Sequence, residues 1–190
     1  MADTPSAAVV NESLQMMGGN TPPVSGAAPN FDTSAAGIAA KYLYAPCVAF
    51  VARQFEWDFS RAYVALAESG NTPPDNWAFE YIYPASAVQV WQVKPPVLAD
   101  ENDPLPTTWA RGNAQVAGVQ TAVIWTDVED AVAVFNNNPT PLVWDAGFRM
   151  AVVRLLASEF AIALGGRPDT SKVLLDSSGM MGELAKTRDS

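Results

Sequence analysis

The sequence contains no histidine and a single cysteine among its 190 residues. Without an imidazole, neither a Ser-His-Asp nor a Cys-His catalytic relay can form. The same shortages exclude histidine-ligated zinc, proximal-histidine haem and cysteine-rich metal clusters, and one cysteine cannot form an intrachain disulfide. Cys47 lies between Ala45-Pro46 and Val48-Ala49. This apolar setting predicts a small buried hydrophobic side chain rather than a nucleophile.

Charged residues are also scarce. They make up 16% of the chain, against about 25% of a typical domain. With 49% hydrophobic residues, the composition predicts a folded core rather than disorder. A protein with so few charged residues has a sparsely charged surface, and this indicates that other subunits cover part of that surface. The formal net charge of −9 disfavours a surface that grips nucleic-acid phosphates, because that affinity comes largely from Lys and Arg.

Long hydrophobic runs are missing as well. No run reaches about 18 apolar residues, so we expect no membrane-spanning segment. The sequence begins Met1-Ala2-Asp3-Thr4-Pro5, with neither a basic region nor an apolar stretch behind it. We therefore expect no signal peptide, and the cytoplasm of the producing cell as the compartment.

Both ends of the chain carry hydrophobic residues at helical spacing. The helices expected on this basis are Pro5–Met17, Asp32–Phe55, Asp145–Gly165 and a last one from Pro168-Asp169 onward. Asp32 and Asp145 are the expected N-caps of the two long helices, because a short polar side chain can accept from the free backbone N–H groups of a first turn. Pro46 should kink or split its helix near Tyr44.

The middle of the chain is predicted to form strands, because short runs rich in aromatic and β-branched residues alternate there with clusters of turn-forming residues. The expected strands are Ser60–Ala67, Ala78–Ile82, Val88–Val93, Thr107–Arg111, Ala114–Val116, Val119–Trp125 and Ala131–Phe135. We expect them to pair antiparallel, because most have no helical connection between them. Arg111-Gly112-Asn113 is short enough for a hairpin turn.

Together these segments predict an α+β fold that is mainly α. We expect a single domain over residues 1–190, in which helices at 5–57 and 140–188 form one helical bundle. An antiparallel β-rich insertion would occupy 58–135.

Candidate chemical groups are few. Asp100-Glu101-Asn102-Asp103 is similar in composition to the start of a calcium-binding loop. It lacks the glycine at the sixth position and the glutamate at the twelfth position of such loops, and Pro104 follows it. Asp127, Glu129 and Asp130 could form paired carboxylates, although we interpret them as exposed charges in a turn. The aromatic residues of the β-rich region have no interleaved basic residues, which favours core and interface roles over base stacking. We expect no catalytic residue, no cofactor and no metal.

The order of features along the chain resembles a known family. It runs from Asn11, Leu14 and Gly18 through Pro23-Val24 to Trp57-x-Phe59, then to Pro74, Trp77, Tyr81, Pro84 and Val90, and ends with the stretch 128–135, Trp144-Asp145 and Phe148. This resembles the head-to-tail adaptor proteins of short-tailed bacteriophages, the group that includes tail tubular protein A. It is also similar to the broader head–tail connector family of long-tailed phages.

The resemblance implies a structural virion protein without enzymatic activity, located in the neck or tail and assembled in the host cytoplasm. Such adaptors form a ring, usually of twelve copies, beneath the portal protein. The opposite end holds the tail nozzle or tail fibres, and DNA passes through the lumen without specific binding. The alternatives are another neck or tail-completion protein, or an enzyme that uses only carboxylates, Ser or Lys.

The family's docking pattern also implies a position for the portal contact. C-terminal segments of such adaptors dock onto the portal, and the C-terminus of this chain is polar. On this basis we expect the portal-docking residues to be Met180, Met181, Leu184, Lys186 and Arg188.

Overall fold

The computed structural model describes residues 4–18, 21–74, 76–96, 107–138, 140–165 and 172–173. The chain divides into two compact units. Unit 1 comprises Met1–Phe55 and Asn138–Ser190, so it draws on both ends of the sequence, and unit 2 comprises Glu56–Asn137.

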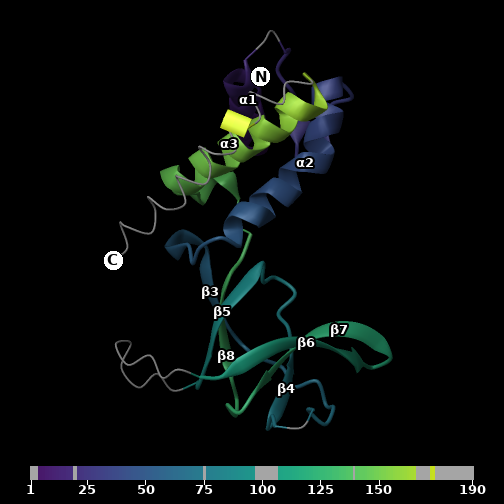
Figure 1. The fold of residues 1–190 in the computed structure, drawn as a ribbon, viewed down its shortest axis with the longest axis vertical. Coiled ribbons are helices and arrows are strands. Elements are labelled where there is room, and N and C mark those ends of the chain that lie inside the picture. The colour runs from purple at the N-terminus through teal and green to yellow at the C-terminus, as the bar shows by residue number, and fades with distance from the viewer. Residues whose placement is uncertain are drawn as a thin grey trace. The chain divides into compact units, whose positions relative to one another are not determined.

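The described residues of unit 1 form three α-helices, a short hairpin and one turn of 3-10 helix. These elements are α1 (Pro5–Met17), β1 (Gly26–Ala27), β2 (Asn30–Phe31), α2 (Ala35–Ala52), η2 (Pro141–Val143) and α3 (Ala146–Ala163). Helices α1 and α2 each pack on α3 (Figure 1). The core between them consists of fully buried side chains, among them Val9, Val10, Ala40, Val48, Val152, Leu156 and Phe160. Burial of this apolar surface stabilises the unit.

The helices of unit 1 begin at capping side chains. The predicted helix Pro5–Met17 is confirmed, and so is the predicted cap Asp145, whose Oδ1 accepts from the Phe148 N–H at 2.9 Å. Asp32 is not the cap of α2. That position belongs to Ser34, whose Oγ accepts from the Gly37 N–H at 3.0 Å. The two residues before Ser34 are needed to join β2 to the helix, and this shifts its start.

Of the kink or split expected at Pro46, the split does not occur, because α2 runs without interruption from Ala35 to Ala52. A proline inside a helix removes one N–H and frees the carbonyl four residues earlier. Here Pro46 and Tyr42, the owner of that carbonyl, both lie on the exposed side of α2. Water can therefore satisfy the carbonyl, and the helix continues past the proline.

In unit 2, the part of the chain that the structure describes forms two three-stranded antiparallel sheets. After the short η1 (Asp58–Ser60), its strands are β3 (Arg61–Ala65), β4 (Phe79–Ile82), β5 (Gln89–Lys94), β6 (Trp109–Val116), β7 (Val119–Thr126) and β8 (Val132–Asn136). One sheet has the order β3-β8-β5 and the other the order β4-β7-β6. Antiparallel pairing was predicted and is confirmed.

The two sheets of unit 2 share a core. Its buried members come from both sheets and from the turn before β8: Tyr81, Val90, Val93, Ile124, Ala131, Ala133 and Phe135. The Tyr81 hydroxyl donates to the Val128 carbonyl at 3.0 Å, which satisfies its polar end inside the core. The unit therefore buries its own apolar face independently of the helices.

The hairpin turn expected at Arg111-Gly112-Asn113 is placed wrongly. Strand β6 runs straight through these residues, and the turn lies at Ala117-Gly118, where φ is 50° and 80°. Two consecutive positive φ values match the hairpin turns whose twist suits the flanking strands. Gly112 has a different role, because a Cβ there would meet the Trp125 ring at 2.1 Å. The missing side chain makes room for that ring.

The predicted fold class, a mainly α chain built as a helical bundle from its terminal helices, is also wrong. The described residues form an α+β fold with three α-helices and eight strands in three antiparallel sheets. The prediction gave the strands too small a part in the fold, because short runs of β-forming residues separated by turns are typical of an insertion at the edge of a domain. In the structure they enclose a core of their own.

Candidate interaction surfaces

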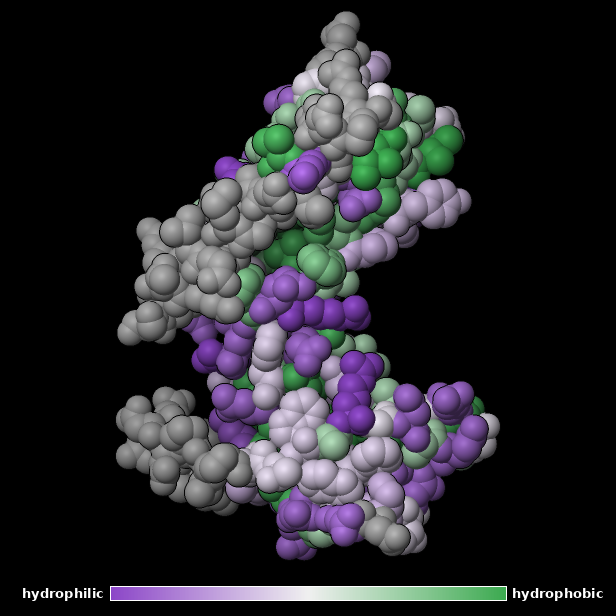
Figure 2. Space-filling model, in the orientation of Figure 1, coloured by the Kyte–Doolittle hydropathy of each residue, from purple (hydrophilic) through white to green (hydrophobic). Residues whose placement is uncertain are grey.

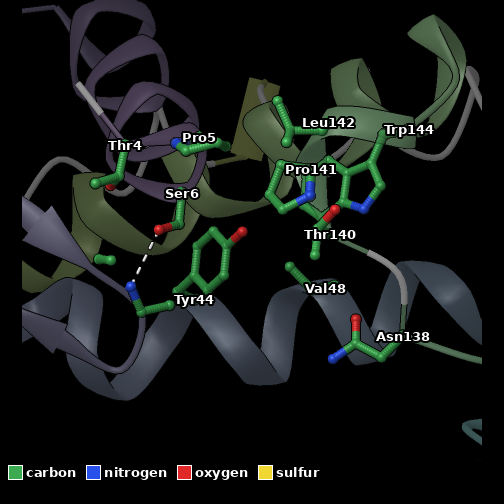
Figure 3. A pocket seen from close by; sticks show the side chains of 12 residues that line it. Thr4, Pro5, Ser6, Tyr44, Val48, Asn138, Thr140, Pro141, Leu142 and Trp144 are labelled. Carbon is green, nitrogen blue, oxygen red and sulfur yellow. Dashed lines mark hydrogen bonds between the residues drawn. The ribbon is translucent and has the colours of Figure 1, made fainter. Parts of the chain in front are cut away.

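Unit 1 contains a cleft of about 470 Å³ (Figure 3). Its lining comes from the start of α1, the β1–β2 hairpin, α2 and the segment around η2: Thr4, Pro5, Ser6, Ala27, Ala28, Tyr44, Val48, Asn138, Thr140, Pro141, Leu142 and Trp144. Tyr44 and Val48 point from α2 into the cleft. The cleft thus joins parts of the chain that lie far apart in sequence.

Hydrogen bonds between α1 and the hairpin fix one wall of the cleft. The Thr4 hydroxyl donates to the Gly26 carbonyl, and the Ala28 N–H donates to Ser6 Oγ at 3.0 Å (Figure 3). Further along α1, the Asn11 side chain pairs with the backbone of Val24: its Nδ2 donates to the carbonyl at 3.0 Å, and its Oδ1 accepts from the N–H at 2.7 Å. The loop between α1 and β1 is therefore held to the helix.

Two aromatic rings also line the cleft. Tyr44 packs edge-on against Phe31 with ring centroids 5.8 Å apart, and Trp144 packs edge-on against Phe148 at 4.9 Å. Burial raises the pKa of Tyr44 to about 12, despite the opposing effect of Arg149. Its hydroxyl therefore remains neutral at physiological pH. Such edge-to-face pairs hold both rings in place.

The lining of the cleft is uncharged and mostly apolar. None of its lining residues is charged, and its volume lies in the range of sites that take small apolar groups. Within the described part of the chain, no group of three or more His, Cys, Asp or Glu side chains could hold a metal ion. The lining offers apolar contact with a few neutral hydrogen-bonding groups.

A second surface lies on the other side of α2. We call it the outer ridge, and it consists of Ile38, Tyr42, Pro46 and Phe50, which follow one another at intervals of four residues. Ile38 is 50% exposed, Tyr42 68% and Phe50 56%. In Figure 2 the surface where Figure 1 places α2 carries hydrophobic residues in green beside residues of intermediate hydropathy in pale purple. The helix is thus apolar on both sides.

In length and composition, α2 is also the one helix of the described segments that could cross a membrane. The core helix of a soluble protein passes the same test. Tyr44, Cys47, Val48 and Val51 are buried within the protein, and the helix packs on α3. The absence of a membrane partner stays a prediction.

Unit 2 holds a buried carboxylate that the sequence analysis did not single out. Glu80 accepts hydrogen bonds from Ser69 Oγ at 2.7 Å, Asn71 Nδ2 at 2.8 Å and Trp125 Nε1 at 2.7 Å. Burial acts to raise the pKa of Glu80, but these donors outweigh it and the pKa is lowered. Both carboxylate oxygens of Glu80 accept hydrogen bonds, so this side chain connects the loop before β4 to strand β7. A single acidic residue in an apolar strand gave no signal of these partners.

Unit 2 also exposes some apolar side chains. Tyr63 and Val64 lie on β3 at the edge of its sheet, and Val119 lies at the tip of the β6–β7 hairpin. The Lys94 ammonium sits 5.0 Å from the centre of the Tyr63 ring. These residues are smaller and more scattered than the outer ridge.

The expected portal-docking residues Met180, Met181, Leu184, Lys186 and Arg188 all lie outside the described residues, and so does the acidic loop 100–103.

Other candidates fall in the described part. Asp127, Glu129 and Asp130 are exposed in the turn between β7 and β8, as interpreted, and Asp127 Oδ1 accepts from the Ala78 N–H at 3.0 Å. Cys47 is buried, as predicted. Burial, with a contribution from Glu159, raises the pKa of its thiol to about 12. The reactive thiolate is therefore disfavoured.

No protein-family model matches this chain, and no curated protein matches it.

Proposed function

We propose that the protein is a structural subunit of a bacteriophage virion, a head-to-tail adaptor that forms a ring beneath the portal protein. Two lines of support carry the proposal. The order of sequence features resembles the adaptor family, and the outer ridge of α2 is a continuous apolar surface. The ridge is the observation on which we place most weight.

The ridge favours assembly for a physical reason. A helix that is hydrophobic all round is normally buried, yet Tyr42 and Phe50 are more than half exposed. Contiguous apolar patches on soluble proteins commonly mark interaction sites, and the centres of such interfaces are rich in aromatic residues and poor in charge. Lys41 is the single charged residue within α2. A neighbouring subunit would remove this surface from water.

The charge of the chain suits the proposed ring. A net charge of −9 per subunit would make a lumen through which DNA slides without binding. The proposed partners are further copies of the chain, usually twelve in all, the portal on one side, and the nozzle or fibre proteins on the other. The proposed location is the neck or tail of the virion, after assembly in the host cytoplasm.

Removal of the C-terminus tests the proposed docking of the portal. Truncation after Gly179 deletes Met180, Met181, Leu184, Lys186 and Arg188. We expect the truncated chain to lose co-sedimentation with the portal protein of its phage, while the full chain co-sediments. Unchanged co-sedimentation would contradict this assignment of the docking residues.

Negative-stain imaging tests the function itself. The full chain is imaged alone and after mixing with the portal protein. We expect closed rings, either in both samples or on the portal alone. A chain that remains a separate monomer in both samples would rule out the adaptor function.

A further inference from the structure

Strand β3 lies at one end of the sheet β3-β8-β5, so it pairs along one of its two edges. The Leu66 N–H donates to the Ala131 carbonyl at 2.8 Å, and alternate residues of an antiparallel strand direct their backbone groups toward the partner strand. Val64 therefore faces β8, whereas Tyr63 and Ala65 direct their N–H and carbonyl groups outward. No described residue hydrogen-bonds to these outward groups, which we call the open edge.

Two other sheet edges in the described part of unit 2 are closed by the chain itself. The segment that follows β3 covers β4, where the Ser69 N–H donates to the Glu80 carbonyl at 3.0 Å. On β5, the Val90 N–H donates to the Tyr83 hydroxyl at 3.0 Å, and the pairing register shifts between Val90 and Gln92. Covering segments and irregular pairing protect the edges of sheets from further strands.

The edges of β6 and β3 differ in their side chains. Strand β6 carries polar side chains at alternate positions, namely Arg111, Asn113 and Gln115. Asn71 Nδ2 also donates to the Gln115 carbonyl at 3.0 Å. Residues 62–65 of β3 include no charged residue and no proline, and their pairing is regular. Tyr63 is 56% exposed and Val64 38%. Strand β3 thus lacks the features that protect an edge strand.

The unpaired backbone groups determine the geometry of a ligand for this edge. An extended segment beside β3 would pair its own N–H and carbonyl groups with the open edge and continue the sheet, which is a recurrent mode of peptide recognition. Strand β3 has five residues, and each residue of an antiparallel strand advances by about 3.4 Å. The edge therefore accepts a segment of similar length, and β-branched residues favour the extended conformation that it needs.

The charge of unit 2 selects among extended segments. Between Glu56 and Asn137 the sequence has 11 acidic and 3 basic residues, a net charge of −8. Glu56 and Asp58 precede β3 and share one cation, Arg61, at 3.2 and 2.8 Å. Glu68 follows the strand and is exposed. Both ends of β3 are therefore acidic and would attract lysine or arginine, whereas a second copy of unit 2 would be repelled.

We infer that the open edge of β3 binds an extended segment of another protein, in which about five apolar or β-branched residues lie between lysines or arginines. The bound segment becomes the fourth strand of the sheet β3-β8-β5. Its backbone supplies the hydrogen bonds, and its basic ends supply the preference for this acidic unit. The inference goes beyond the proposed function, because the site needs unit 2 alone and no ring.

A peptide of this chemistry tests the site on the full chain. The probe is fluorescently labelled Lys-Lys-Thr-Val-Thr-Val-Thr-Lys-Lys, and the control peptide has glutamate at every lysine position. By fluorescence anisotropy we expect saturable binding of the probe with a Kd below about 1 mM, and binding of the control weaker by about tenfold or more. In hydrogen–deuterium exchange, residues 61–66 should exchange more slowly with the probe bound, because the N–H groups of Tyr63 and Ala65 gain acceptors.

Proline substitution tests the backbone pairing separately from charge. Ala65→Pro removes one outward N–H from the open edge, and an edge strand tolerates proline where its N–H faces solvent. Asn113→Pro is the matched control on β6, because Asn113 has the same outward orientation as Gln115. We expect Ala65→Pro to weaken probe binding by about tenfold or more and Asn113→Pro to leave it unchanged. Circular dichroism checks that both variants fold.

Three results would overturn the inference. They are no saturable binding of the probe up to about 1 mM, slowed exchange confined to residues outside β3, or equal affinity of Ala65→Pro and the wild type. If Ala65→Pro does not fold, the exchange of residues 61–66 in the wild type decides. Wild-type rings that do not bind the probe would leave the proposed function standing, and a permanent monomer that binds it would overturn the function but support this site.

Discussion

Replacement of Gly37 by alanine should reverse the usual effect of that substitution in a helix. Alanine normally stabilises a helical position by about 1 kcal/mol relative to glycine. Gly37 lies in the first turn of α2 against Asp32, and a Cβ there would meet the Asp32 carbonyl oxygen at 2.3 Å and its Oδ1 at 2.4 Å. The nearest atom belongs to the backbone, so it cannot rotate away.

The expected loss follows from what must move. Overpacking of this kind costs about 1–3 kcal/mol. Displacing Asp32 also weakens its hydrogen bonds from the Ser25 N–H at 2.6 Å and the Ser34 N–H at 3.0 Å, each contributing about 1 kcal/mol. After the gain in helix propensity is subtracted, we expect a net loss of about 1–3 kcal/mol.

Urea denaturation followed by circular dichroism measures this loss. Gly147→Ala is the matched control, because Gly147 occupies the first turn of α3 and a Cβ there would meet a side-chain atom, Asp145 Oδ1, at 3.1 Å rather than backbone. The control should raise the free energy of unfolding by up to about 1 kcal/mol, less the cost of a small shift of Oδ1, which accepts from the Phe148 N–H. A Gly37→Ala variant as stable as the wild type, or more stable, would refute the packing of Asp32 against α2.

Three further predictions concern residues that hold loops and strands in place. Asn11→Ala leaves the buried N–H and carbonyl of Val24 without partners and should cost about 2–4 kcal/mol in urea denaturation. Gly112→Ala should displace the Trp125 ring, alter the near-ultraviolet circular dichroism and cost about 1–3 kcal/mol. Hydrogen bonds, chiefly from the Ser25 backbone, lower the pKa of Asp32 from 3.8 to about 2. Since the folded-state pKa is depressed, its stabilising effect is complete above about pH 4 and is lost as the pH falls toward 2. The stability advantage of the wild type over Asp32→Asn should shrink over that interval; a constant difference would contradict it.

Local signals in the sequence predicted most helix and strand positions. Helix α1 was expected at its observed bounds, and Asp145 caps α3 as predicted, because both depend on side chains next to the elements they start. The local rules failed where a residue far away in the sequence determines the structure. Gly112 is typical of a turn, but it lies within a strand because the Trp125 ring, thirteen positions later, packs over it.

The candidate surfaces were much harder to foresee. The sequence indicated that neighbouring subunits cover part of the chain, but not which part. The cleft gathers short segments from both ends of the sequence, and no spacing rule connects Thr4 or Tyr44 with Trp144. The outer ridge could have been found from the interval of four between Ile38, Tyr42, Pro46 and Phe50. Hydrophobic residues on every side of α2 concealed it, because composition alone does not separate the buried side from the exposed one.

Native mass spectrometry of the full chain, alone and with its portal protein, tests the central claim of ring assembly most directly. The account predicts one closed species whose mass is a fixed multiple, usually twelve, of the 20.2 kDa subunit, formed alone or on the portal. A single species at 20.2 kDa under both conditions would contradict it.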